Sequence, residues 1–181
     1  MSDGTAHAKI NLALVVGPAR DDGKHELVSV FQRVELADRI SVEPAESTTV
    51  EGFAEDTIVR AALDALEAPH GWRVRIEKHV PVAAGLGGGS SDAATALKLA
   101  NAQLDEPREL QPIAARLGAD VPFFLYDGPQ LATGEGSILA PLRLPQDFAV
   151  LLLLPTGAKK PSTAQVYADF DARDGARGFD E

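Results

Sequence analysis

The sequence predicts an α+β fold in which a mixed β-sheet packs against helices and a glycine-rich loop joins a strand to a helix. Apolar and charged residues alternate from Trp72 to Glu77, the pattern of a half-buried strand. Apolar residues from Ile58 to Leu66 recur at helical spacing. The chain has 181 residues, 45% of them hydrophobic and 24% charged, a typical composition for one globular domain.

The first half of the chain is expected to hold four strands and one helix. Residues 6–16 alternate in polarity, with Lys9 and Asn11 on one face. Asp56 is a suitable N-cap for a helix that runs to about Glu67, because its carboxylate can accept bonds from the first amides. The expected strands lie at 6–16, 27–34, 39–42 and 72–76, with turns at 17–23 and 36–38.

The second half is expected to alternate between helices and short strands. Gly118 is a suitable end for a helix, and Gly134–Gly136 has the composition of a hairpin turn. The expected helices lie at 91–103, 106–117 and 162–170, and the expected strands at 123–125, 129–133, 138–142 and 149–154. We expect one domain over residues 1–170, followed by a polar tail at 171–181 that frays.

Composition and charge exclude several classes of function. The chain contains no cysteine, so disulfides, thiolate metal sites and cysteine nucleophiles are excluded. Its formal charge of -10 opposes nonspecific binding of nucleic acid or an anionic membrane surface. The longest apolar run, 148–154, is too short to cross a bilayer. The N-terminus lacks the basic and apolar regions of a secretory signal, which favours a cytoplasmic location.

The segment 81–97, PVAAGLGGGSSDAATAL, has the composition of a phosphate-binding loop. Its glycines allow the backbone to approach an anion closely, and the helix that follows offers unpaired N–H groups at its start. Ser90 and Ser91 add hydroxyl groups. The alternative is an ordinary glycine-rich turn with a capping serine, which is hard to reconcile with four glycines in five positions, at Gly85, Gly87, Gly88 and Gly89.

Three further polar residues are ambiguous when each is taken alone. Asp120 lies in the segment GADVPFF and is either a functional acid or a capping aspartate. Lys9 lies in an apolar strand and is either a functional cation or a lysine that reaches out to water. His25 follows the turn glycine Gly23 closely and, by itself, has the position of an ordinary turn histidine.

Taken together, the motifs resemble the GHMP kinases. AKINL at 8–12, the glycine–serine stretch at 85–92 and GADVPFF at 118–124 occur in that family's order. The triple-glycine form GLGGGSSDAA is similar to that of the kinases of 4-diphosphocytidyl-2-C-methyl-D-erythritol. The resemblance runs from about residue 6 to 170 and implies the family's N-terminal, ATP-binding and catalytic domain. It also implies phosphoryl transfer from ATP to the substrate's 2-hydroxyl group, in non-mevalonate isoprenoid precursor biosynthesis.

The resemblance implies roles for individual residues on the ATP side. Asp120 matches the catalytic aspartate that takes or orients the hydroxyl proton, and Lys9 matches the lysine that keeps this carboxylate ionised. Mg²⁺ is implied as an ion that bridges the phosphates, with no residue assigned as its ligand. The implied ATP-binding residues are Lys78, Pro81, Val82, Ala83, Ala84, Gly85, Leu86, Gly87, Gly88, Gly89, Ser90 and Ser91.

On the substrate side, the resemblance implies binding by Asn11, His25 and Tyr167, with Tyr167 stacking on cytosine. Lys24 stands where the family has a second stacking aromatic residue. The expected partner is thus a small molecule, a cytidine diphosphate-linked methylerythritol, and not a nucleic acid or a membrane.

The resemblance implies that family members continue into a second domain, which we expect this chain to lack. We therefore expect weak or absent activity, and self-association through the face that the missing domain would cover. The alternatives are a nucleotide-binding fragment without turnover, or a GHMP kinase for another small alcohol such as mevalonate or a sugar.

Overall fold

A computed structural model describes residues 1–53, 56, 58–155 and 162–179. The chain divides into two compact units, each described by itself below. The first comprises Met1–Ile10 and Arg33–Asp127, and the second Asn11–Gln32 and Gly128–Glu181. Two long strands, β1 (Ser2–Ala19) and β2 (His25–Ala45), pair with each other and contribute to both units.

The first unit contains a mixed sheet. β4 (Gly71–Glu77) pairs antiparallel with the second half of β2, from Arg39 opposite Glu77 to Ala45 opposite Gly71. β3 (Thr49–Glu51) pairs parallel with β4. In β4, Trp72, Val74 and Ile76 are buried and the residues between them are exposed, so the predicted alternation is confirmed.

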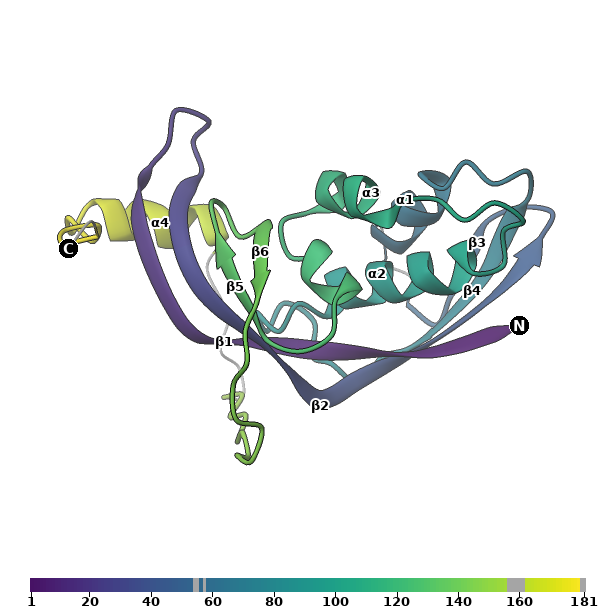
Figure 1. The fold of residues 1–181 in the computed structure, drawn as a ribbon, viewed down its shortest axis with the longest axis horizontal. Helices are drawn as coiled ribbons and strands as arrows, with labels where there is room; N and C mark the ends of the chain where they lie inside the picture. Colours follow the sequence, from purple (N-terminus) through teal and green to yellow (C-terminus); the bar gives the residue numbers. More distant parts are fainter. Residues whose placement is uncertain (54–55, 57, 156–161, 180–181) are drawn as a thin grey trace. The chain divides into compact units, whose positions relative to one another are not determined.

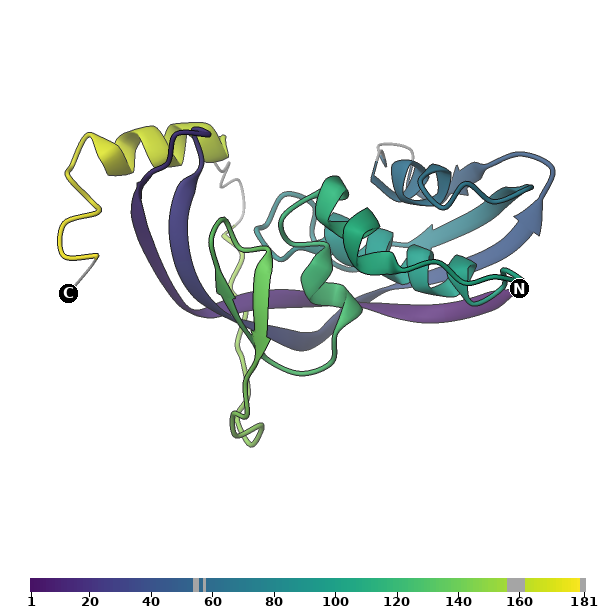
Figure 2. The ribbon, with the colours of Figure 1, turned by 45° about the horizontal axis from the view of Figure 1, so that its top comes forward.

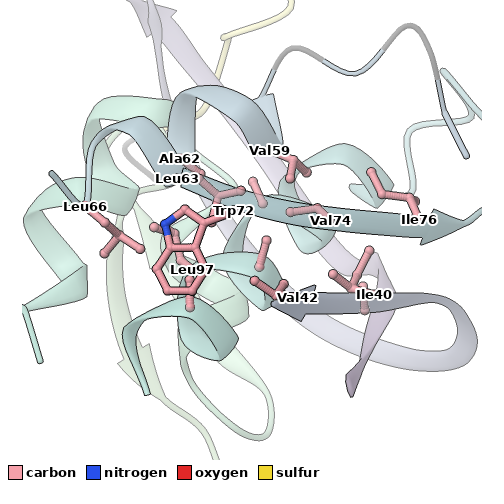
Figure 3. Packing of buried hydrophobic residues seen from close by; sticks show 14 of the residues in the cluster. Ile40, Val42, Val59, Ala62, Leu63, Leu66, Trp72, Val74, Ile76 and Leu97 are labelled. Atoms are coloured by element: carbon pink, nitrogen blue, oxygen red, sulfur yellow. The ribbon is translucent and has the colours of Figure 1, made fainter. Parts of the chain in front are cut away.

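Three helices cover one face of this sheet: α1 (Ile58–Asp64), α2 (Gly88–Asn101) and α3 (Leu110–Leu117) (Figures 1 and 2). The core lies between the sheet and the helices, with the ring of Trp72 at its centre (Figure 3). The residues that α2 turns to the core include Ala93, Ala96 and Ala100, all fully buried. These small side chains allow the helix axis to approach its neighbours closely. The α+β class with a mixed sheet packed against helices is confirmed.

The helix boundaries differ from the predicted ones by a few residues. α1 ends at Asp64, and its predicted cap is confirmed, since Asp56 accepts hydrogen bonds from the backbone N–H groups of Val59 and Arg60. α2 begins at Gly88, three residues earlier than expected. α3 begins at Leu110, later than expected.

The second unit contains a smaller, antiparallel arrangement. β5 (Gln130–Thr133) pairs with the first half of β2 and with β6 (Ile138–Pro141), so the predicted hairpin around Gly134–Gly136 is confirmed. The predicted helix near residues 162–170 is α4 (Thr163–Asp171), capped by Ser162. Turns follow it over 172–179, and residues 180–181 lie outside the described part.

Two predicted interruptions in the strands are wrong. No turn occurs at residues 36–38, because β2 runs through them. Asp38 is fully buried, and its carboxylate accepts hydrogen bonds from the backbone of His79 and Val80 instead of turning its own chain. The loop predicted at 17–23 also begins too early, because β1 extends to Ala19.

Two predicted strands are wrong. Residues Pro122–Leu125 form a short 3₁₀ helix, η1, because Pro122 favours the first turn of a helix and both Phe123 and Phe124 are buried. Residues 149–154 form no regular structure, and Leu151 is 82% exposed. Across the described ranges, every helix falls short of the length and apolar character that a membrane span requires.

Candidate functional site

Lys9 and Asp120 form an ion pair in the first unit. The Lys9 Nζ atom lies 3.6 Å from Asp120 Oδ2. The lysine side chain is only 7% exposed, whereas that of the aspartate is 37% exposed. Lys9 therefore does not reach out to water, the alternative that its strand position allowed. A cation fixed inside the protein faces a carboxylate that solvent, and hence a ligand, can reach.

The glycine-rich loop lies against this pair. The backbone N–H of Lys9 donates a hydrogen bond of 2.8 Å to the carbonyl of Leu86. Gly87 has φ 70, in the left-handed region, and a Cβ atom there would lie 3.0 Å from both Lys9 Cγ and Phe124 Cζ. Three segments far apart in the sequence, at residues 9, 87 and 120–124, thus meet around a position that only glycine fills without strain.

The start of α2 presents backbone amides to an anion. Gly87 is its N-cap, and among the described residues no side chain caps this first turn. Ser91 N–H is the first to bond within the helix, to the carbonyl of Gly87, so the amides of Gly88–Ser90 have no partner of the α-helical type. Ala83 and Gly85 also have positive φ, a geometry that favours an anion-binding concavity. The sequence predicts that this segment binds phosphate groups, and free amides at a helix start are the groups that such a role requires.

The other predicted ATP-binding residues line the loop to different depths. Val82 is 59% exposed, and Pro81, Ala84 and Leu86 are half-buried. Ser90 is half-buried, whereas Ser91 is 1% exposed and belongs to the inner face of α2. The amides and Ser90 are therefore the accessible polar groups of the cradle.

Lys78 lies beneath the loop and bridges two carboxylates. Its Nζ atom donates hydrogen bonds to Asp38 Oδ2 at 2.6 Å and Asp92 Oδ2 at 2.9 Å. Burial tends to lower the pKa of Lys78, but the bonds to both aspartates outweigh it and raise the pKa above its ordinary value. Burial acts to raise the pKa of Asp38, but the bonds from Lys78, Val80 and His79 lower it overall.

Asp92 is the second carboxylate and shares this one ammonium group with Asp38. It is 1% exposed, and its Oδ1 atom is buried without a hydrogen-bond partner among the described residues. Burial raises the pKa of Asp92 to about 7, and the charge of Asp38 acts in the same direction. One of the two carboxylates thus takes up a proton close to neutral pH.

We expect the Asp92→Asn variant to gain stability relative to the wild type as the pH rises. A carboxyl group with a raised folded-state pKa stabilises the fold fully below its unfolded pKa near 3.8, and this stability is lost as the pH rises through about 7. The difference amounts to at most about 4 kcal/mol, and an asparagine does not ionise. Melting temperatures at pH 4.5 and pH 8 check this. Asp64→Asn, on the exposed face of α1, is the control, and a pH-independent difference at Asp92 would contradict the prediction.

The predicted substrate-binding residues belong to the second unit. Asn11 Nδ2 donates a hydrogen bond of 2.6 Å to Ser29 Oγ. His25 is 7% exposed, and its ring stacks on that of Tyr167 with 4.3 Å between centroids and 10° between planes. Its Nε2 atom lies 2.8 Å from Asp171 Oδ1. The structure thus brings His25 and Tyr167 together, while Lys24 is exposed and pairs with Glu135.

Several functional candidates were not found from the sequence. Asp38 carries the signal of a turn residue, and Asp92 that of a helix cap. Arg33 gives no signal at all, yet its guanidinium donates to the carbonyls of Phe124 and Tyr126 and so holds the segment that follows Asp120. Their roles depend on partners far away in the sequence.

Comparisons with known proteins agree with this geometry. The family model described as "GHMP kinases N terminal domain" matches residues 56–128, which include the cradle and Asp120. The 4-diphosphocytidyl-2-C-methyl-D-erythritol kinase of Novosphingobium aromaticivorans is 39% identical, over 94% of this chain and 62% of the relative. That of Desulfitobacterium hafniense is 44% identical, over 92% of this chain and 60% of the relative.

A solved structure shows the same likeness in three dimensions. The crystal structure of a 4-(cytidine 5'-diphospho)-2C-methyl-D-erythritol kinase superposes with a TM-score of 0.72 and 45% identity, over 80% of this chain and 56% of that one. The chain thus spans less than two thirds of the length of these relatives. The chain has the α+β fold of the GHMP kinase N-terminal domain, and that family's model matches residues 56–128.

Proposed function

We propose that this chain is the ATP-binding and catalytic part of a kinase that phosphorylates the 2-hydroxyl group of 4-diphosphocytidyl-2-C-methyl-D-erythritol. One observation carries the proposal: Lys9, the amide cradle at Gly87–Ser90 and Asp120 converge in the first unit. The names of the relatives support the choice of substrate. The relatives' names, which describe kinases of a small biosynthetic intermediate, support a cytoplasmic reaction.

Each group in this arrangement has a task in phosphoryl transfer. The substrate hydroxyl oxygen bonds to the γ-phosphorus of ATP, the bond from that phosphorus to the β-phosphate oxygen breaks, and ADP leaves. Asp120 accepts the hydroxyl proton, because its carboxylate is the accessible member of the pair. Lys9 holds that carboxylate in place from the buried side, and the amides of Gly88–Ser90 hold the phosphates. Mg²⁺ would supply charge that neutralises the phosphates when it binds together with ATP, and no described residue is assigned as its ligand.

A turnover assay tests the proposal. ADP release is measured with MgATP in the presence and absence of 4-diphosphocytidyl-2-C-methyl-D-erythritol, on the protein at its natural length. ATP binding is measured by calorimetry on the same sample. Substrate-dependent ADP release supports the proposal. Binding without release reduces the protein to a nucleotide-binding module, and release with mevalonate or galactose instead assigns another GHMP activity.

We also propose that Tyr167 is the stacking surface for cytosine. Its ring already lies on that of His25, which Asp171 holds by its edge. Tyr167→Ala is expected to raise KM for the cytidine substrate by roughly 5- to 100-fold, the range of one lost stacking contact, and to leave KM for ATP unchanged. Tyr167→Phe keeps the ring and is expected to keep the affinity.

Steady-state kinetics with each substrate varied in turn check this prediction. Val166→Ala, a truncation of a 44% exposed neighbour on α4, is the matched control. An equal rise in both KM values for Tyr167→Ala would point to a disturbed fold and would contradict the assignment.

Self-association of the isolated chain is the last part of the proposal. In the second unit, Leu12 and Leu14 of β1 are 42% and 51% exposed, and Leu153 is 81% exposed. Apolar surface of this kind favours association. Sedimentation velocity over a range of concentrations checks it, and a monomer at all concentrations would contradict it.

A further inference from the structure

The cluster of Asp38, Lys78 and Asp92 connects the two ends of the glycine-rich loop. Lys78 directly follows β4, where the chain enters the loop. Asp92 lies in the first turns of α2, where the chain has left the loop. Asp38 lies within β2, a strand of the sheet beneath. One ammonium group and two buried carboxylates therefore join a strand, a loop entrance and a helix.

The contacts of Asp38 fix the entrance to the loop. Its Oδ1 atom accepts hydrogen bonds from the backbone of His79 at 2.5 Å and Val80 at 2.8 Å, and its Oδ2 atom accepts from Lys78. Asp38 is 0% exposed and Val80 is 2% exposed. Three consecutive residues of the entrance are thus bonded to one carboxylate of the sheet, and hydrogen bonds to a charged group are among the stronger ones in proteins.

The same lysine fixes the exit from the loop. Its hydrogen bond to Asp92 fixes the first turns of α2 next to the loop entrance. A Cβ atom at Gly88 would lie 3.0 Å from Val80 Cγ1 and 3.3 Å from Lys78 Nζ, so entrance and helix start are in close contact. The ring centroid of Phe53 lies 5.5 Å from Lys78 Nζ. The lysine side chain is 16% exposed, so protein groups surround most of it.

We propose that Asp38, Lys78 and Asp92 form a clamp that fixes both ends of the loop and so positions the phosphate-binding amides, with neither aspartate touching the nucleotide. This inference rests on the proposed function for its nucleotide, and its residues are positioning residues. A competing assignment makes Lys78 a direct ligand of the ATP phosphates. The two assignments predict opposite changes in ATP affinity when an aspartate loses its charge. A lysine that binds the phosphates directly binds them more tightly once a competing carboxylate is removed, whereas the clamp predicts weaker binding.

The experiment compares Asp38→Asn and Asp92→Asn with the wild type and with Asp64→Asn, an exposed control on α1. ATP affinity is measured by calorimetry with MgATP. The clamp predicts a loss of about tenfold for Asp38→Asn and about fivefold for Asp92→Asn, with kcat at saturating ATP within about threefold of the wild type. Unchanged or tighter ATP binding in both variants would overturn the clamp and favour direct contact.

Thermal melts separate positioning from a loss of folding. The melting temperature of each variant is measured at the pH of the titration, so weaker ATP binding in a variant that is still folded at the titration temperature does not come from unfolding.

Hydrogen exchange without nucleotide tests the clamp independently of any kinase activity. In Asp38→Asn, the amides of His79 and Val80 and the bonded amides of the first turns of α2, beginning at Ser91, are expected to exchange faster together. Faster exchange at His79 and Val80 alone would overturn the clamp. If the wild type bound no ATP, the proposed function would fail, and this exchange pattern would still decide the inference. If Asp38→Asn does not fold, Asp92→Asn provides the same two readouts.

Discussion

Asp120→Asn is expected to lower the turnover number by about 10²- to 10⁴-fold and to leave the affinity for ATP unchanged. The asparagine amide has nearly the shape of the carboxylate but cannot accept the proton of the substrate hydroxyl. The carboxylate is 37% exposed, so the substitution leaves no buried charge at Asp120 itself. Its partner Lys9 keeps its backbone bond to Leu86, which holds β1 against the loop.

The measurement combines steady-state kinetics with calorimetric titration of MgATP. Asp64→Asn, the same chemical change on the exposed face of α1, is the matched control and should retain full turnover. Parallel losses of turnover and ATP affinity in Asp120→Asn would indicate a folding defect. Wild-type turnover in that variant would remove Asp120 from the mechanism.

Gly87→Ala is expected to weaken ATP binding by roughly tenfold to hundredfold and to lower the free energy of unfolding by about 2 kcal/mol. The residue has φ 70, where an alanine is strained, and its Cβ would lie 3.0 Å from Lys9 Cγ and Phe124 Cζ. Relief of this contact must move the loop, the lysine or the aromatic ring. Each of these movements displaces a group of the cradle or of the ion pair.

The neighbouring Gly89→Ala is the matched control for stability. Its Cβ would meet Ile58 Cδ1 at 3.8 Å, an ordinary contact, and alanine favours a helix over glycine. Thermal melts should therefore show a lower melting temperature for Gly87→Ala and an equal or higher one for Gly89→Ala. Equal melting temperatures of both variants below the wild type would contradict the prediction, because Gly89 has neither the left-handed φ nor the close contacts of Gly87.

Patterns confined to a few neighbouring residues predicted most of the elements. The alternation around Val74 predicted β4, and Asp56 predicted the start of α1, because each signal acts within one element. The turn predicted at 36–38 was wrong because of Asp38. Aspartate often forms turns, but here its carboxylate accepts a hydrogen bond from the distant Val80. Phe123 and Phe124 suggested a strand, although burial of both rings on the inner side suits a helical turn.

The part of the candidate site that lies within one short segment was predictable from the sequence. The cradle is a local feature, and composition alone indicated it. Lys9 and Asp120 lie 111 positions apart, and only the family resemblance suggested that they meet. Asp92 offered no signal beyond that of a cap, because its contact with Lys78 depends on how β4 and α2 pack. Pairings that the tertiary structure creates cannot be inferred from one sequence by pattern.

The position of the cradle amides depends on the buried alanines of α2, because both belong to the same helix. Ala96 lies eight residues from Gly88, or about 12 Å along the helix axis, and is completely enclosed. A helix behaves as a stiff rod over this length, so an added methyl group at its middle tilts or lifts its beginning as well. A larger side chain at Ala96 is therefore expected to change the position of the amides at the start of α2. The interior packing of this helix and the geometry of the cradle are in this way coupled.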